Sequence, residues 1–469
     1  MNSTWWRSPA TRSGLLVGAT LVLAVGGQFA MPAQPKPAAT VVVPISSLAL
    51  ACPALPAGTP GLAVTMKAGL LGEATGSTLD VQSMPTQHAA VPSASVVTLA
   101  VRRPGAALVQ AQGAAAPLLV ADASILGTTA TTRGYATYGC AAPSASQWLA
   151  GGATVVGRTS VLDIANIDAT AAVVDVDVWS EAGKSAARSL QGLEIPPRSV
   201  RAIDLSLIDP GRASYVVHVL AASGQVTSAI VDRGQQALAS LGIDVVEPAA
   251  RPLASGLVGV VPGGSTDATL SLLSPGVPTA VQVSLVTSDG TYPLAGAENL
   301  TLEADRVLRI PIPNDALTGD VAVLVQADTP VMAGVGEILD LKGGGDLASE
   351  PFMAPIYRNA SITVDAGVSR ATLLLYSDTA IDATVIDAVG GSRSQRTVHV
   401  RAGIVTRVRV VDGHGRTHLL SVLPAADGIV SGSVLLEAAS VGMDATSVAP
   451  LTSVRGYVAV PPVAADVSR

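Results

Sequence analysis

A thirteen-residue pattern occurs three times in this 469-residue chain and constrains the fold more than any other feature. Apolar residues take positions 1, 3, 8, 11 and 13 of each copy, at residues 193–205, 300–312 and 398–410. A weaker copy lies earlier, at residues 91–101. The matching valines, Val96, Val200, Val307 and Val405, are 104, 107 and 98 residues apart. A fixed period of this kind predicts four homologous units of about 100 residues.

The periodicity inside each unit is that of β-strands. Val174, Val176 and Val178 alternate with Asp175 and Asp177, so one strand face is buried and the other solvated. About seven short strands in ~100 residues are typical of an immunoglobulin-like sandwich. We therefore predict an all-β chain of tandem immunoglobulin-like sandwiches, with strands at residues 162–166, 173–179 and 200–205. One large β-propeller with two blades in each unit is the alternative.

The amino terminus predicts the cellular compartment. Residues 14–31 carry no charge and would span about 27 Å as a helix, close to the hydrocarbon thickness of a bilayer. Two arginines precede them, which places residues 1–13 in the cytoplasm and exports everything after residue 31. We expect a single-pass membrane anchor at 14–31, followed by a Pro/Ala tether at 32–40. A cleaved signal peptide with a site at 24–26 is the competing interpretation.

Beyond the tether we expect four β modules, at residues 41–139, 140–249, 250–349 and 350–469. The glycine-rich stretch 340–346 lacks the Gly-Lys-Ser/Thr ending of a phosphate-binding loop. We interpret it as a flexible connection between the third and fourth modules.

The net charge bears on the class of binding partner, and the two cysteines bear on covalent cross-linking. The net charge of −7 and the pI of about 5.2 argue against a nucleic-acid partner, whose phosphates require clustered basic residues. Cys52 and Cys140 are the only cysteines. Because an exported compartment permits oxidation and no third thiol competes, we predict a disulfide between them.

No pattern of catalytic or metal-binding residues stands out. The chain has no Gly-x-Ser-x-Gly elbow and no Ser-x-x-Lys pair. His414 and His418, with Asp412 just before them, form the one local cluster, and the adjacent glycines indicate a polar hairpin. Asp175 and Asp177 are interpreted as a solvated strand face. We therefore expect no enzymatic activity, no cofactor and no metal.

Two tryptophans follow the amino-terminal segment. Trp179 is two residues after Asp177 in the alternating strand, so we expect its side chain on the same solvated face as Asp175 and Asp177. It is therefore a candidate platform for a glycan ligand, because sugar C–H groups stack on aromatic faces. Trp148 is expected to anchor the core at the start of a module.

Residues 140–152, with Gly157-Arg158 and residues 162–166, are the most distinctive stretch. Together with the anchor and Cys52-Pro53, they resemble an actinobacterial family of secreted, membrane-anchored proteins of unknown function. The resemblance implies a cell-envelope setting, because genes of that family neighbour envelope glycosyltransferases, and it supplies no catalytic residue.

These features together predict a non-catalytic envelope scaffold or adhesion protein. The alternatives are an accessory module that binds envelope glycan or a glycan-export complex, and an unrecognised hydrolase. The expected partners are the membrane and an envelope glycan or protein. The sequence predicts no oligomeric state.

Overall fold

A computed structural model of the chain describes residues 41–56, 59–72, 74, 79–84, 87–90, 96–102, 105–237, 239–249, 251–341, 344–413, 415–426, 428–440, 443–453 and 457–460. The predicted anchor at 14–31 and the tether at 32–40 lie outside these residues. Among the residues that are described, no helix is long and apolar enough to cross a membrane. The chain divides into two compact units. In the first, β1 (Val41–Pro44) pairs antiparallel with β36 (Tyr457–Val460).

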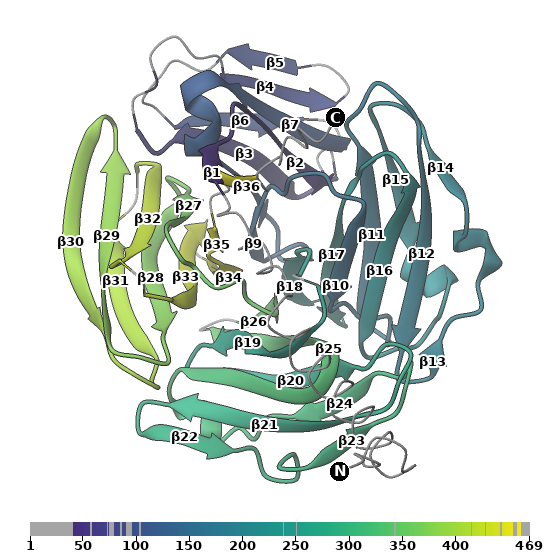
Figure 1. Cartoon of the computed structure of the whole chain (residues 1–469). Coiled ribbons are helices and arrows are strands. Elements are labelled where there is room, and N and C mark those ends of the chain that lie inside the picture. The colour runs from purple at the N-terminus through teal and green to yellow at the C-terminus, as the bar shows by residue number, and fades with distance from the viewer. Residues whose placement is uncertain are drawn as a thin grey trace, which may run out of the picture. The chain divides into compact units, whose positions relative to one another are not determined.

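The second unit, residues 45–456, contains four β-sandwiches, which we call modules 1 to 4 (Figure 1). Each module packs an outer sheet on an inner sheet, and the four modules share one strand order, to which module 4 adds the edge strand β35. The outer sheet of module 1 consists of β2 (Ser47–Leu55), β7 (Gly105–Gln112), β4 (Leu79–Met84) and β5 (Gln87–Ala90), and that of module 2 consists of β10 (Ser146–Ala150), β16 (Tyr215–Ser223) and β12 (Ala172–Ser180) with β13 (Gly183–Lys184) and β14 (Leu193–Ile195). The outer sheet of module 3 consists of β19 (Leu253–Val261), β25 (Val321–Leu341) and β21 (Thr279–Thr287) with β22 (Gly290–Pro293) and β23 (Leu300–Leu302). That of module 4 consists of β35 (Thr452–Ser453), β27 (Ala360–Val364), β32 (His418–Pro424), β29 (Ile381–Val389) and β30 (Ser392–Val400).

The inner sheets repeat a second order of four strands. They are β6 (Val97–Val101), β3 (Leu62–Leu70), β8 (Leu119–Gly127) and β9 (Tyr135–Gly139) in module 1; β15 (Ser199–Asp204), β11 (Arg158–Asn166), β17 (Thr227–Gln236) and β18 (Ala239–Val246) in module 2; β24 (Leu308–Pro311), β20 (Ser265–Leu273), β25 and β26 (Gly344–Pro351) in module 3; and β31 (Thr406–Asp412), β28 (Val368–Tyr376), β33 (Ser431–Ser440) and β34 (Met443–Pro450) in module 4. The long strand β25 serves both sheets of module 3, pairing with β19 and β21 by its first half and with β20 and β26 by its second.

The all-β prediction of repeated sandwiches is confirmed. Each repeat contains two packed sheets, whereas a propeller blade is one four-stranded sheet. The helical residues of the described ranges lie in short 3₁₀ turns, namely η2 (Gly113–Leu118), η3 (Arg188–Leu190), η4 (Leu205–Leu207) and η5 (Ala316–Thr318). The repeated pattern marks the crossing from the outer to the inner sheet: its copies fall on β14–β15, on β23–β24 and on the end of β30 with β31.

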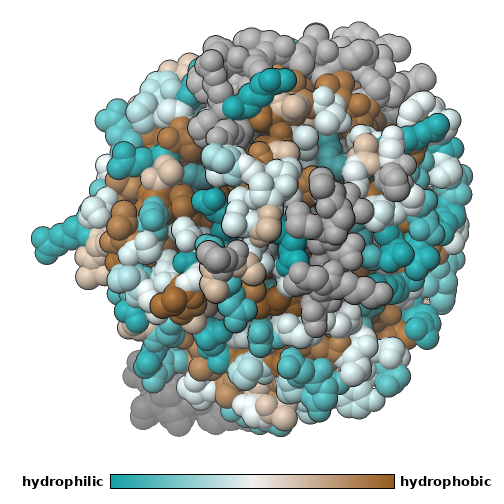
Figure 2. Space-filling model, turned by 180° about the vertical axis from the view of Figure 1, so that it is seen from behind, coloured by the Kyte–Doolittle hydropathy of each residue, from teal (hydrophilic) through white to brown (hydrophobic). Residues whose placement is uncertain are grey.

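Period-two alternation produces the core of each module. In β12, Val174, Val176 and Val178 are buried against inner-sheet residues such as Leu162 and Ile164. On the face seen in Figure 2, hydrophobic residues are scattered among hydrophilic ones and do not gather in one large patch. The apolar half of the composition is therefore largely used inside the sandwiches.

The glycine-rich stretch 340–346 was predicted wrongly. Its described residues belong to paired strands of module 3, with Leu341 of β25 opposite Gly344 of β26, so the stretch is not a connection to module 4. The strand β26 that follows contributes to the centre of the second unit.

The last inner strand of each module lies at a common centre (Figure 1). There β9 contacts β18, β18 contacts β26, β26 contacts β34, and β34 contacts β9. The contacts close into a ring, so each module is fixed against two neighbours.

Candidate functional site

A single carboxylate, that of Asp346 on β26, joins all four modules at the centre. Its Oδ2 accepts hydrogen bonds from the backbone N–H of Tyr135 in module 1 and of Thr446 in module 4, both at 3.0 Å. Its Oδ1 accepts from the N–H of Ile243 in module 2 at 3.3 Å and of Leu347 at 3.0 Å. Burial raises the pKa of Asp346 to about 8, although the four donated bonds lower it.

The backbone must approach Asp346 closely for these bonds to form. Gly242 has φ +112°, and a Cβ atom there would lie 2.1 Å from Asp346 Oδ1. A side chain at this position is therefore excluded both by conformation and by space.

Other buried carboxyls lie at the joints between modules. Glu247 follows β18, and its Oε1 accepts from the N–H of Gly139 in module 1 at 2.9 Å. Asp122 on β8 accepts from both the N–H and the hydroxyl of Thr363 in module 4, each at 2.7 Å. Burial is the main cause that raises the pKa of Glu247 to about 8 and that of Asp122 to about 6.

The joint between modules 1 and 4 also holds a buried ion pair. Lys67, 0% exposed on β3, donates to Asp365 Oδ2 at 2.9 Å. The hydroxyls of Ser124 and Tyr135 donate to the same oxygen at 2.5 and 2.6 Å. Burial acts to raise the pKa of Asp365, but the charge of Lys67 and these hydrogen bonds outweigh it, so the pKa is lowered.

A cavity of about 420 Å³ opens beside these joints and is lined by the segments that follow the last inner strand of each module. These segments, with the strand ends, contribute residues 139–142, 247–249, 351–354 and 450–453. Asp122 and Glu247 lie in its wall with their carboxyls already bonded to backbone, and Arg251 is exposed at it. Its volume lies in the range of about 300–1,000 Å³ that is usual for small-ligand sites. This central cavity is the candidate functional site.

The prediction of one disulfide is confirmed. Cys52 and Cys140 are bonded with their Cα atoms 4.4 Å apart, across 88 residues. Cys140 also lines the central cavity. The bond therefore ties the first strand of module 1 to the connection that leads into module 2.

Trp179 is not an exposed platform, which corrects the prediction made from its position in the alternating strand. It does lie on the outward face of β12, yet it is only 3% exposed because module 3 covers that end of the strand. Its indole Nε1 donates to Asp305 at 3.0 Å. One ring face stacks on Trp148 at 5.6 Å between centroids, and the ammonium of Lys184 lies 4.9 Å from the ring centroid.

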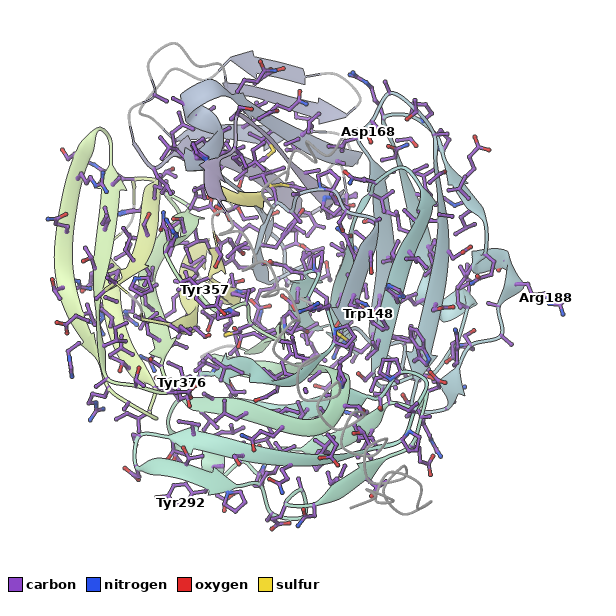
Figure 3. All side chains as sticks on the ribbon, in the orientation of Figure 1. Trp148, Asp168, Arg188, Tyr292, Tyr357 and Tyr376 are labelled. Atoms are coloured by element: carbon purple, nitrogen blue, oxygen red, sulfur yellow. A yellow bond between two sulfur atoms is a disulfide. The ribbon has the colours of Figure 1, made fainter. Side chains whose placement is uncertain are left out.

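Trp148 is half-buried and joins a stack between strands instead of a module core. Its other neighbour is the ring of His218, 4.0 Å away and nearly parallel. Figure 3 shows Trp148 near the centre of the four modules. Trp179 is buried and stacked on Trp148, so its ring is not free to bind a sugar.

Ser146 and His218 form the nearest approach to a catalytic pair. Ser146 Oγ lies 2.8 Å from His218 Nε2 at the edge of the central cavity. The nearby carboxylate of Asp177 is bonded to Lys184 at 3.0 Å, so no described carboxylate orients the imidazole. Burial lowers the pKa of His218, and its ring is held against Trp148. We therefore interpret the contact between Ser146 and His218 as a structural hydrogen bond.

The other candidates from the sequence are not brought together. His418 bonds to Asp387 at 2.9 Å, whereas His414 lies outside the described residues. Asp175 accepts from the N–H of Gly192 at 2.7 Å. In the described part of the chain, no group of three His, Cys, Asp or Glu residues is arranged to hold a metal ion.

The central carboxyls are not among the residues predicted from the sequence. Asp122 and Lys67 each stand alone in an apolar strand, in Leu119–Gly127 and Leu62–Leu70. An isolated charge inside such a run is a signal of burial with a partner, and it was available from the sequence.

Fold and site together define an all-β protein in which four homologous sandwiches surround a central cavity. Residues 95–411 match the profile of a family of unknown function, DUF5719, and the chain belongs to that family. No curated protein matches. Among solved structures, that of infectious bursal disease virus Gx strain is similar over 87% of this chain and 83% of that one, at 10% identity and a TM-score of 0.11. A TM-score this low does not indicate a shared fold.

Proposed function

We propose that this protein is a non-catalytic scaffold or adhesion protein of the cell envelope that presents four β modules in a fixed array. The observation that carries the proposal is the closed set of joints at the centre. Asp346 alone bonds to backbone of all four modules. A tandem array without such joints would bend at each connection, because interfaces between domains are otherwise small and mobile. A fixed array presents its surface loops at constant spacing, which suits a scaffold.

The proposal places the array outside the cell, held by an anchor at residues 14–31, with actinobacterial envelopes as the setting. The disulfide between Cys52 and Cys140 is compatible with an oxidising compartment. The uncharged stretch that follows two arginines supports a single-pass anchor.

Fractionation of cells that express the full chain tests this proposal. The protein should remain with the membranes, and protease added outside intact cells should digest residues 32–469. Recovery of a soluble mature chain that begins near Gly27 would show that the segment is a cleaved signal peptide. Protection from external protease would contradict export altogether.

The central cavity favours a second function, that of an accessory module for an envelope glycan or a glycan-export complex. Its lining offers serine hydroxyls, the amide of Gln147 and the exposed guanidinium of Arg251. Such groups can bond sugar hydroxyls. Binding of purified envelope glycan to the full chain should then weaken in Arg251→Gln and stay unchanged in Arg188→Gln, which lies on the periphery (Figure 3). Equal binding by both variants would count against the cavity.

A further inference from the structure

A second, larger cavity of about 720 Å³ lies between module 1 and module 4. Its module 1 side is the end of β3 with Leu71 and the start of β6 with Val96. Its module 4 side includes Val389 at the end of β29 and Leu419 on β32. Leu419 is buried, and the other three side chains are half-buried. The cavity therefore has aliphatic walls and no described aromatic ring.

Two arginines stand at this cavity, and no described residue of its lining supplies a negative charge beside them. Arg393 begins β30 just after the β29–β30 turn, and Arg416 lies in the loop between β31 and β32. Both are exposed, and within the described ranges neither side chain has an ion pair or a hydrogen bond. None of the described residues that line the cavity is acidic. The nearby carboxylate of Asp387 is bonded to His418 at 2.9 Å and is not directed to either arginine.

The described lining of this cavity contains no acidic residue, which distinguishes it from another cavity that contains arginines. The 180 Å³ cavity between modules 2 and 3 is lined by Arg158 and Arg309, but Asp267 and Glu337 line it too. Arg158 is moreover paired with Asp232. In a chain of net charge −7, two arginines that no described residue pairs with, placed beside aliphatic walls, favour an anionic partner.

We propose that the cavity between modules 1 and 4 binds a monomeric single-chain anionic amphiphile, that is, an acyl chain ending in a carboxylate or phosphate. The aliphatic walls shelter the chain from water. The guanidinium groups of Arg393 and Arg416 bind the anionic head, since their planar donors match the oxygens of carboxylates and phosphates. This inference goes beyond the scaffold function and does not require it.

Calorimetric titration of the full-length chain, held in discs of neutral phosphatidylcholine, tests the proposal. Octyl phosphate supplies both charge and chain, inorganic phosphate supplies charge alone, and octyl glucoside supplies the chain with a neutral head. Octyl phosphate should bind at least ten-fold more tightly than either of the other two. The double variant R393Q/R416Q should lose at least ten-fold in affinity for octyl phosphate, whereas Arg188→Gln should not change it.

Several results would overturn the proposal. Inorganic phosphate that binds as tightly as octyl phosphate would reduce the site to a simple anion site. Octyl glucoside that binds equally well would show that the arginines contribute nothing. If anionic phosphatidylglycerol discs abolish the difference between wild type and the double variant, bilayer headgroups occupy the arginines, and a free amphiphile is the wrong ligand. Both arginines are exposed, so the variants should fold, and circular dichroism would verify it.

Discussion

Replacement of Asp346 by asparagine should loosen the whole array. In its ionised form the carboxylate is acceptor-only, and each of its oxygens accepts two backbone hydrogen bonds. The amide nitrogen of the introduced asparagine cannot accept, so two buried N–H groups lose their partner and face a donor. At about 1–3 kcal/mol for each unsatisfied group, the loss is about 2–6 kcal/mol. We expect the lower half of that range, because the amide can turn its nitrogen toward the pair that contains the long 3.3 Å bond from Ile243.

Urea unfolding measured by two probes would check this magnitude. Tryptophan fluorescence follows the Trp148–Trp179 stack at the joint of modules 2 and 3, and circular dichroism follows the strands. Asp168→Asn, at an exposed carboxyl, is the matched control and should change the free energy of unfolding by less than about 0.5 kcal/mol. Small-angle scattering should also show an expanded Asp346→Asn variant. Equal stability of the two variants would refute the role of Asp346 as the central joint.

Three further predictions concern the same joints. Burial raises the pKa of Glu247 and of Asp346 to about 8, well above the range of an unfolded chain. The folded state therefore holds more protons, and the free energy of unfolding should fall as pH rises from about 5 to 9; a rise over this interval in urea titrations would contradict the burial of these groups. Lys67→Met leaves the carboxylate of Asp365 buried without its counter-charge, which should cost about 3–5 kcal/mol, and a double variant that adds Asp365→Asn should recover part of it. Removal of the disulfide by Cys140→Ser should cost about 4–5 kcal/mol from loop entropy, and an unchanged unfolding midpoint would show that the cross-link constrains nothing.

The strands could be predicted from the sequence because their signal is local. Alternation in β12 identified both the strand and its buried face, and the valines of that face are indeed in the core of module 2. The repeated pattern, which predicted four homologous units, falls in the structure on the crossing between the two sheets. Such signals depend on residues a few positions apart, where period and side-chain direction are coupled.

The sequence did not predict whether the outward face of a strand is exposed to solvent or covered by another module. Trp179 has the parity that was predicted, but Asp305 of module 3 bonds to its indole across 126 residues. Parity tells which face of a sheet a side chain occupies, and only tertiary packing tells whether another module covers that face. The same reasoning applies to Asp346, whose partners Tyr135, Ile243 and Thr446 are 211, 103 and 100 residues away.

The polar joints explain how four similar modules assemble in one order. Apolar contacts between homologous sandwiches would be nearly interchangeable, because each module presents the same kind of surface. The buried polar contacts differ at every joint: Asp122 of module 1 bonds to Thr363 of module 4, whereas Glu247 of module 2 bonds to Gly139 of module 1. A wrong neighbour would leave a buried carboxyl without its donor, which costs more than the contact contributes when it is made. Buried carboxyls therefore contribute little to the stability of the folded chain, yet they can select a single arrangement of the modules. A fixed arrangement is what a scaffold requires.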